Sequence, residues 1–254
     1  MKNLIFMLTI MIFVGVGCTD NLPENDLKKE NLKGKVKSVR TVYYGAVEKF
    51  GEIVKDECRR TEVDIYNQEG NRVERTSYKS DGSLWNKGKY IYDNKGNMIE
   101  ESEYDSDGIL WCKKEYTYNN KGNMIEESRY KSDDSLWSKG KYIYDNKGKM
   151  IEESEYDSDG RFLSKDKYNY DNKGNMIAVN TYNSGGSLVR KYKYSYDDKG
   201  NNIEVSEYNS DDCLEWKGKY RYEEYDNKEN WTKQISYYDD KPSSIVEREI
   251  EYYE

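Results

Sequence analysis

Short stretches of alternating polar and hydrophobic residues recur along most of the chain, separated by turn sequences at a fixed spacing. Glycines 26 residues apart mark one turn of each unit, and a second turn signal, usually Asp-Gly, falls 12 residues later. Two turns per unit leave two stretches of about 8 to 10 residues, a length typical of β-strands. The first turn contains Gly70, Gly96, Gly122, Gly148, Gly174 and Gly200; the second contains Asp81-Gly82, Asp107-Gly108, Asp133-Asp134, Asp159-Gly160, Gly185-Gly186 and Asp211-Asp212.

Both turns have the composition of a three-residue hairpin loop, in which a type I turn is followed by a residue in the left-handed region. Glycine adopts that conformation at the lowest cost, and Asp or Asn is tolerated there. This explains why Asp134 and Asp212 can stand where other units have glycine. We therefore expect each 26-residue unit to contain two strands joined by tight turns.

The turns also predict a register and hence two faces. If Asn94-Lys95-Gly96 is the loop, Tyr92 pairs with Met98 and Lys89 with Glu101. Successive side chains of a strand point to opposite faces. This register therefore predicts one aromatic face and one face with a lattice of Lys–Glu pairs. The first face would carry Leu84, Tyr90, Tyr92, Met98 and Tyr104; the second would carry Trp85, Lys87, Lys89, Ile91, Ile99, Glu101 and Glu103.

These patterns predict an all-β fold. We expect an antiparallel β-meander of about 14–16 strands, built from 26-residue hairpin repeats, in a single curled or open sheet. The repeats occupy residues 61–224, with an N-terminal β cap at 32–60 and a divergent C-terminal cap hairpin at 225–254. Divergent terminal units are typical of repeat arrays, because they protect the edges of the sheet.

The core sequence of the unit, Tyr90-Ile91-Tyr92-Asp93-Asn94-Lys95-Gly96-Asn97, resembles the YD repeat of the Rhs and YD-repeat family. The resemblance covers most of residues 60–235. In that family the repeats form a continuous β-meander that coils into a strip or shell with aromatic residues inside, and long members enclose a toxin. The resemblance implies an exported β-array. We expect too few units here to close a shell, and no toxin.

Composition narrows the range of functions. The chain is 35% charged and only 35% hydrophobic, a balance typical of disorder, but its 27 tyrosines raise the aromatic content to 14% and favour folding. It contains no histidine, which excludes His-based triads and His-zinc sites. The net charge of −8 disfavours a nucleic-acid partner. We expect no metal site and no cofactor.

The N-terminus has the features of a lipoprotein signal peptide at residues 1–17. Lys2 precedes an apolar run from Leu4 to Val16, which at thirteen residues is too short to span a bilayer. The run ends Gly15-Val16-Gly17-Cys18 and resembles the lipobox of bacterial lipoproteins, whose cysteine is lipidated and becomes the new N-terminus. An ordinary cleaved signal with an incidental Cys18 is the alternative. If Cys18 is lipidated, residues 18–31 would be a polar tether between the lipid and the folded part of the chain.

Three cysteines remain after Cys18: Cys58, Cys112 and Cys213. An odd number is unusual for an exported, disulfide-bonded chain. Cys112 and Cys213 lie about four units apart in the repeat, too far for a bridge whose Cα atoms must lie within about 7 Å. We interpret these cysteines as small, partly buried residues at ordinary strand positions.

Candidate ligand-binding residues are Trp85, Trp111 and Trp137, which share one position of the repeat on the charged face. Neighbouring units would place their rings about 10 Å apart, two strand spacings. Such a row could stack on successive sugars of a glycan. The alternative, which we favour, is that each tryptophan covers Ile and Lys stems of its own sheet.

Two other polar patterns have simpler explanations. The segments Asp105–Gly108 and Asp157–Gly160 are rich in oxygen ligands, but a tyrosine stands where an EF-hand-like calcium loop has its bidentate Glu. Turn formation accounts for these segments. The carboxylate pairs Glu100-Glu101 and Glu152-Glu153 could suggest a glycosidase, but successive residues point to opposite faces. We expect no catalytic residues.

The sequence therefore favours a non-enzymatic, lipid-anchored protein of the bacterial cell envelope, at the outer membrane or cell surface. It would act as a β-repeat scaffold or as an adhesion and binding surface. The alternative is a glycan-binding module that uses the tryptophan row. Expected partners are the membrane, through lipid on Cys18, and a glycan or an envelope protein.

Overall fold

The computed structural model describes residues 24–254, which form one short helix and sixteen strands. The predicted signal peptide (residues 1–17) and the predicted lipidation site Cys18 lie outside the described residues. The elements are α1 (Asp26–Lys29), β1 (Val36–Lys49), β2 (Glu52–Tyr66), β3 (Arg72–Lys79), β4 (Leu84–Tyr92), β5 (Met98–Asp105), β6 (Leu110–Tyr118), β7 (Met124–Lys131), β8 (Leu136–Tyr144), β9 (Met150–Asp157), β10 (Phe162–Tyr170), β11 (Met176–Asn183), β12 (Leu188–Tyr196), β13 (Asn202–Asn209), β14 (Leu214–Tyr225), β15 (Trp231–Tyr238) and β16 (Lys241–Tyr252).

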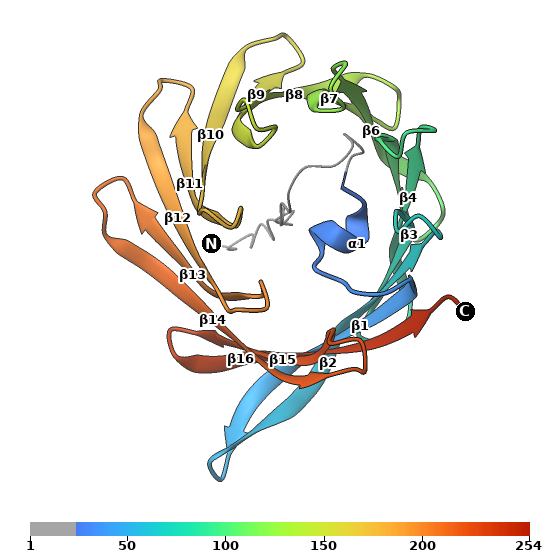
Figure 1. Ribbon diagram of the computed structural model, residues 1–254, viewed down its shortest axis with the longest axis vertical. Helices are drawn as coiled ribbons and strands as arrows, with labels where there is room; N and C mark the ends of the chain where they lie inside the picture. Colours follow the sequence, from blue (N-terminus) through green and yellow to red (C-terminus); the bar gives the residue numbers. More distant parts are fainter. Residues whose placement is uncertain (1–23) are drawn as a thin grey trace.

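The strands form a closed antiparallel barrel. Each strand pairs with its neighbours in sequence, and β1 pairs with β16 to complete the ring. Figure 1 looks into this ring, with the β1–β2 hairpin extending beyond the wall. The all-β antiparallel meander is confirmed, and its sixteen strands lie at the upper end of the expected range. The expectation of a single curled or open sheet, with too few units to close, was wrong.

The two terminal segments close the barrel. They pair with each other from Val36 opposite Tyr252 to Gly45 opposite Ser244, instead of protecting two separate edges. The closing strands are long, with 14 residues in β1 and 12 in β16. A strongly twisted meander of this length brings its edges together, and edge pairing satisfies backbone groups that would otherwise remain exposed. The divergent sequences of the ends therefore form the seam.

The hairpin turns have the predicted geometry. In the β4–β5 turn the amide of Gly96 donates to the carbonyl of Asp93, and the amide of Asp93 donates to the carbonyl of Asn97. Gly96 has φ +83°, while Asp134 and Asp212, which replace glycine, have φ +59° and +60°. The substitution rule deduced from the sequence is thus confirmed.

The register contains a β-bulge that the sequence did not predict. Tyr92 pairs with Met98 as expected, but Ile91 pairs with Glu100, so Ile99 is the extra residue. Beyond the bulge, Tyr90 lies opposite Glu101 and Lys87 opposite Tyr104. A one-residue shift moves side chains to the other face of the strand. The same shift occurs in the corresponding hairpins of the other units.

The face assignments change accordingly. Tyr90, Tyr92 and Met98 face the interior, and Trp85, Lys87, Lys89, Ile91 and Ile99 face outward, as predicted. Glu101 and Glu103, predicted outside, face inward, and Tyr104, predicted inside, faces outward beside Lys89. The barrel interior therefore carries carboxylates as well as phenol rings.

Candidate functional site

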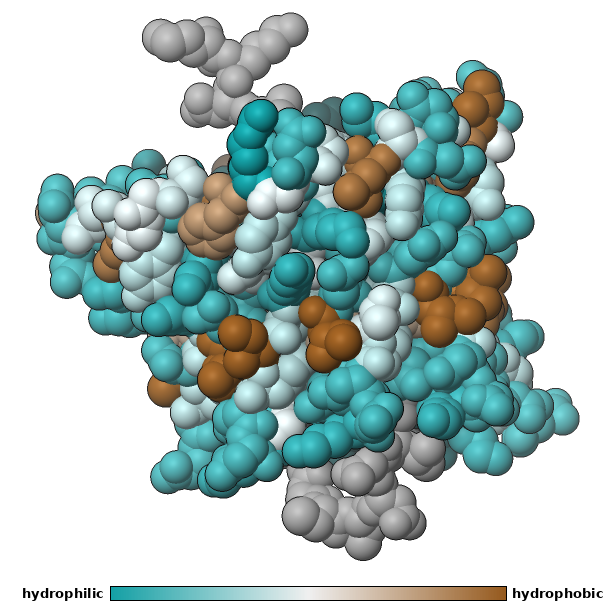
Figure 2. All heavy atoms as spheres, turned by 90° about the horizontal axis from the view of Figure 1, so that it is seen from above, coloured by the Kyte–Doolittle hydropathy of each residue, from teal (hydrophilic) through white to brown (hydrophobic). Residues whose placement is uncertain are grey.

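The tryptophan row lies on the outer wall. Trp85 on β4, Trp111 on β6 and Trp137 on β8 have exposed fractions of 52%, 45% and 50%. Leu163 and Val189 continue the row with exposures of 42% and 37%. The side view in Figure 2 shows hydrophobic patches separated by hydrophilic residues on the wall that it displays. The predicted tryptophans are thus exposed and aligned.

Lysines occupy the middle of the outer wall, at two successive outward positions of β4, β8, β10, β12 and β14, whereas β6 has Lys113 and Glu115 there. In β4, β8, β10 and β14 the first lysine forms a cross-strand ion pair: Lys87 with Glu74 (2.8 Å), Lys139 with Glu126 (2.7 Å), Lys165 with Glu152 (3.1 Å) and Lys217 with Glu204 (2.7 Å). In β4, β8, β10 and β12 the second lysine lies over an outward tyrosine ring, as Lys141 does over Tyr156 at 5.1 Å from the ring centroid. A lattice of Lys–Glu pairs thus exists on the outer wall, but the predicted pair of Lys89 with Glu101 was wrong: Lys89 lies opposite Ser102 and over the ring of Tyr104.

Tyrosines line the interior in two rows. The second tyrosine of most Tyr-x-Tyr sequences lies within hydrogen-bonding distance of a backbone carbonyl 20 residues earlier, as Tyr118 does with Met98 (2.7 Å) and Tyr170 with Met150 (2.7 Å). In β6, β8 and β10 the first tyrosine donates to a carboxylate, as Tyr116 does to Glu101 (2.8 Å). These bonds satisfy the hydroxyls that burial would otherwise leave unpaired. The aromatic lining is therefore primarily structural.

Charged side chains of the inner wall have different environments in successive units. Burial alone would raise the pKa of Glu101, but Lys114 at 2.9 Å and the Tyr116 hydroxyl lower the pKa below its usual value. Burial raises the pKa of Glu153, with a contribution from Asp166, and burial also raises the pKa of Asp166. The equivalent positions farther along the chain are apolar, and Val179 and Val205 join a buried cluster with Met176 and Tyr194.

A strap at residues 25–33 crosses one end of the barrel. Figure 1 shows α1 inside the ring of strands. The Asp26 carboxylate accepts hydrogen bonds from the amide of Arg72 (2.9 Å) and the hydroxyl of Tyr92 (2.6 Å). Glu30 accepts from Tyr66 (2.6 Å) and Arg72 (2.8 Å). The first half of the strap is therefore fixed to the wall formed by β2, β3 and β4.

The second half of the strap reaches other turns at the same end of the barrel. The Asn31 side chain donates to the carbonyl of Lys199 and to Asn201, each at 3.1 Å, in the β12–β13 turn. Lys33 donates to the side chains of Asn230 and Glu229 in the β14–β15 turn. These contacts could not be predicted from the sequence, because the segment has the polar composition of a tether.

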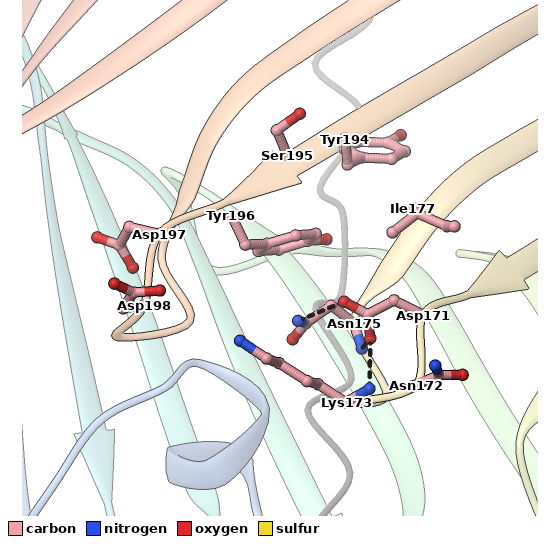
Figure 3. Close-up of a pocket in the computed structure, with 10 residues that line it drawn as sticks. All are labelled: Asp171, Asn172, Lys173, Asn175, Ile177, Tyr194, Ser195, Tyr196, Asp197 and Asp198. Atoms are coloured by element: carbon pink, nitrogen blue, oxygen red, sulfur yellow. Dashed lines mark hydrogen bonds between the residues drawn. The ribbon is translucent and has the colours of Figure 1, made fainter.

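The Asp-rich turns use their carboxylates to hold their own backbone. Figure 3 shows a shallow depression between two such turns, where Asp171 accepts from the amide of Lys173 and from both the amide and the side chain of Asn175, each at 2.9 Å. Asp105 likewise accepts from the amides of Asp107 and Ile109. Among the described residues, no group of three or more Cys, Asp or Glu side chains could hold a metal ion. These contacts explain the Asp-rich sequences as turns.

The three cysteines of residues 24–254 are free thiols. Cys112 is buried, Cys58 is half-buried and Cys213 is exposed beside the β13–β14 turn. The prediction of small, partly buried residues thus fits Cys112 and Cys58 but not Cys213. Burial raises the pKa of the Cys112 thiol, which disfavours the reactive thiolate.

Within residues 24–254, no helix has the length and apolar character needed to cross a membrane. No family model matches the sequence, and no curated protein sequence matches it. A porin-like protein from Bacteroides uniformis has a similar structure, with a TM-score of 0.57 and 13% sequence identity over 86% of this chain and 98% of that chain. The likeness shows a shared fold, so this chain is a sixteen-strand β-barrel that resembles a porin-like protein.

Two toxin complexes also match this chain, each over a small part of its own length. TcdB2-TccC3-Cdc42 matches with a TM-score of 0.33 and 17% identity, over 76% of this chain and 10% of that chain. TcdB2-TccC3 without its hypervariable C-terminal region matches with a TM-score of 0.33 and 15% identity, over 86% of this chain and 12% of that chain. Similarity at this level carries no argument about function.

Proposed function

We propose that this chain is a non-enzymatic, lipid-anchored protein of the bacterial cell envelope whose barrel stands outside the bilayer and serves as a scaffold or binding surface. The observation that carries the proposal is the charged middle of the outer wall. The fold shared with a porin-like protein supports an envelope location, and the lipobox-like sequence at Cys18 supports the anchor.

A barrel inserted in a bilayer turns an apolar band about 25 Å tall toward the lipid. Here the order along an outer-wall strand is Trp85, Lys87, Lys89 and Ile91, so the charges occupy the middle and the apolar residues the ends. A lysine at the bilayer midplane costs about 2–4 kcal/mol. Because the lysines recur in successive units, this cost would be incurred many times, and the outer wall favours water.

A protease site inserted between Thr19 and Leu22 would test where the barrel stands. We expect cleavage of isolated membranes to release a folded barrel into the supernatant, because only the lipid would hold it. The unmodified chain treated with the same protease is the control. A barrel that stays in the membrane after complete cleavage would show that the strands are inserted.

Cys18→Ser tests the anchor separately. We expect the chain to move from the membrane fraction to the soluble envelope fraction, with its thermal unfolding unchanged. Cys213→Ser, at an exposed turn, is the matched control and should stay in the membrane fraction. If Cys18→Ser also stayed there, the lipid would not be what holds the protein.

The second candidate function is glycan binding by the tryptophan row. The observation that favours it is the similar exposure of Trp85, Trp111 and Trp137 at one repeat position on alternate strands. Strand spacing separates neighbouring rings by about 10 Å, and flat aromatic faces at regular intervals can stack on sugars. The net charge of −8 disfavours nucleic acid as the partner, so a glycan or an envelope protein remains.

A glycan array probed with the full chain would test this candidate. We expect Trp111→Ala to abolish binding without changing the melting temperature, because the ring is exposed. Leu163→Ala, at the aliphatic continuation of the row, should preserve binding. Absence of binding by the unmodified protein would remove the glycan candidate and leave the scaffold proposal standing.

The proposal assigns no catalytic residue. The opposed carboxylates of Glu153 and Asp166 are the arrangement that hydrolysis would use most readily. Hydrolysis of an envelope polysaccharide that disappeared in Asp166→Asn would overturn the non-enzymatic assignment.

A further inference from the structure

Arg248 on β16 is an interior arginine that has no carboxylate partner among residues 24–254. It lies opposite Thr41 in the register, and its guanidinium stands over the ring of Trp231, 3.5 Å from the ring centroid. Its Nε atom has no exposed surface and no hydrogen-bond partner. Within residues 24–254, Arg248 forms no ion pair. Burial lowers the pKa of the Arg248 guanidinium.

The neighbouring inner wall has no spare carboxylate for Arg248. Its other arginines are each matched to a carboxylate: Arg60 to Glu62 (3.1 Å), Arg72 to Glu30 (2.8 Å) and Arg75 to Asp64 (2.6 Å). The largest favourable charge interaction on Arg248 comes from Glu30, which is already held by Tyr66 and Arg72. Among the described residues, this part of the interior thus carries one guanidinium in excess.

We propose that Arg248 is the centre of an anion-binding site inside the barrel, and that it takes the oxyanion group of a small molecule. Stacking on Trp231 uses the face of the guanidinium and leaves its N–H donors in the plane, where they match the oxygens of a carboxylate or phosphate. Arg248 is half-buried as a whole residue, although its Nε atom has no exposed surface.

The surroundings of Arg248 suit an anion that also carries an apolar or aromatic part. Tyr222 lies beside Trp231, with ring centroids 5.4 Å apart, and the Tyr222 hydroxyl is already used on the carbonyl of Asn202. These two rings present apolar surface next to the cation. A buried arginine next to such a surface binds an oxyanion more strongly than an exposed one, because water competes less.

The test uses the full chain, uniformly labelled with ¹⁵N, and inorganic phosphate as the probe. The side-chain Nε–Hε resonance of Arg248 is followed during titration with sodium phosphate, with sodium chloride keeping the ionic strength constant. Arg221, an outer-wall arginine paired with Glu223 and stacked on Tyr237, is the internal control. We expect a saturable shift of the Arg248 resonance and none of the Arg221 resonance. Sodium acetate in a second titration distinguishes carboxylate from phosphate preference.

Variants provide the second readout. Arg248→Gln should weaken phosphate binding at least about tenfold, as expected for the loss of charged hydrogen bonds, whereas Arg221→Gln should not change it. If Arg248→Gln fails to fold, the titration of the unmodified chain decides alone. A linear drift of the Arg248 resonance, or equal shifts of Arg248 and Arg221, would overturn the proposal.

Discussion

Glu153 on β9 and Asp166 on β10 lie directly opposite each other in the strand register and face the barrel interior. Tyr168 donates a hydrogen bond to Glu153 at 2.7 Å, but one buried oxygen of Asp166 has no partner. No lysine or arginine within residues 24–254 forms an ion pair with either carboxylate. The pKa values of both groups are raised, chiefly by burial.

Asp166→Asn should stabilise the protein at neutral pH. A raised carboxyl pKa means that the folded state favours the protonated form of Asp166. The protonated carboxyl therefore stabilises the folded protein below about pH 4, and this stabilisation is lost as the pH rises through the raised pKa. We expect the melting temperature at pH 7 to rise by about 2–4 °C, the shift that roughly 1 kcal/mol produces in a chain of this size. The gain should vanish near pH 4.

Asp198→Asn is the matched control for this measurement. Asp198 is an exposed turn residue, and Asn172 already occupies the equivalent position of the preceding unit. Its melting temperature should stay unchanged at both pH values. A fall in the melting temperature of Asp166→Asn at pH 7 would contradict the prediction.

The strap should have the opposite pH dependence. Burial would raise the pKa of Asp26, but Lys29, the Tyr92 hydroxyl and the Arg72 amide outweigh burial and lower it. A lowered carboxyl pKa contributes stability above its unfolded value, near pH 4, and this is lost as the pH falls further. We expect hydrogen exchange at the Leu27 amide, corrected for its intrinsic rate, to accelerate below about pH 4. Asp26→Asn should abolish this pH dependence; an unchanged profile would exclude Asp26 as its cause.

Gly70 and Gly82 have nearly the same backbone conformation, with φ +83° and +81°, but different surroundings. A Cβ on Gly70 would lie 2.6 Å from Nδ2 of Asn25 and 3.0 Å from Cδ1 of Leu27, whereas a Cβ on Gly82 meets nothing within 4 Å. Gly82→Ala should cost about 1 kcal/mol of unfolding free energy, from the left-handed backbone alone. Gly70→Ala should cost more and also increase exchange at Leu27 about tenfold. Equal exchange at Leu27 in both variants would mean that the strap does not rest on Gly70.

Tyr92→Phe should loosen the strap, and Tyr118→Phe should not. Both hydroxyls lie within hydrogen-bonding distance of a carbonyl of a neighbouring strand, but only that of Tyr92 also reaches Asp26. Each variant should lose about 1 kcal/mol of stability. Denaturant unfolding measures that loss, and exchange at Leu27 and Leu32 measures the strap. Faster exchange at those amides in Tyr118→Phe as well would indicate a general loosening of the barrel.

The repeat period was enough to predict the strands, the turns and the left-handed residues, because each of these depends on neighbouring residues. Barrel closure depends on how the ends of the chain meet. Val36 and Tyr252 are far apart in sequence, and no local pattern records their pairing. The bulge at Ile99 could not be predicted from the sequence, because isoleucine is found on either face of a strand. This one extra residue places the Glu101 side chain inside the barrel.

The candidate site was predicted in part. The tryptophan row followed from one repeat position, and the structure exposes it. The unpaired state of Arg248 could not be predicted, because it depends on carboxylates from β2 and from the strap being engaged elsewhere. Unpaired charges in a closed barrel can be identified only when the positions of all inward side chains are known.

The contact between Asn25 and the carbonyl of Glu69 has a consequence for orientation. Asn25 is seven positions after Cys18 in the sequence, a stretch that can extend over at most about 25 Å. With lipid on Cys18, this short segment would hold the end of the barrel that the strap crosses close to the lipid headgroups. The opposite end, where the second turn of each repeat lies, would then be the part of the molecule farthest from the membrane.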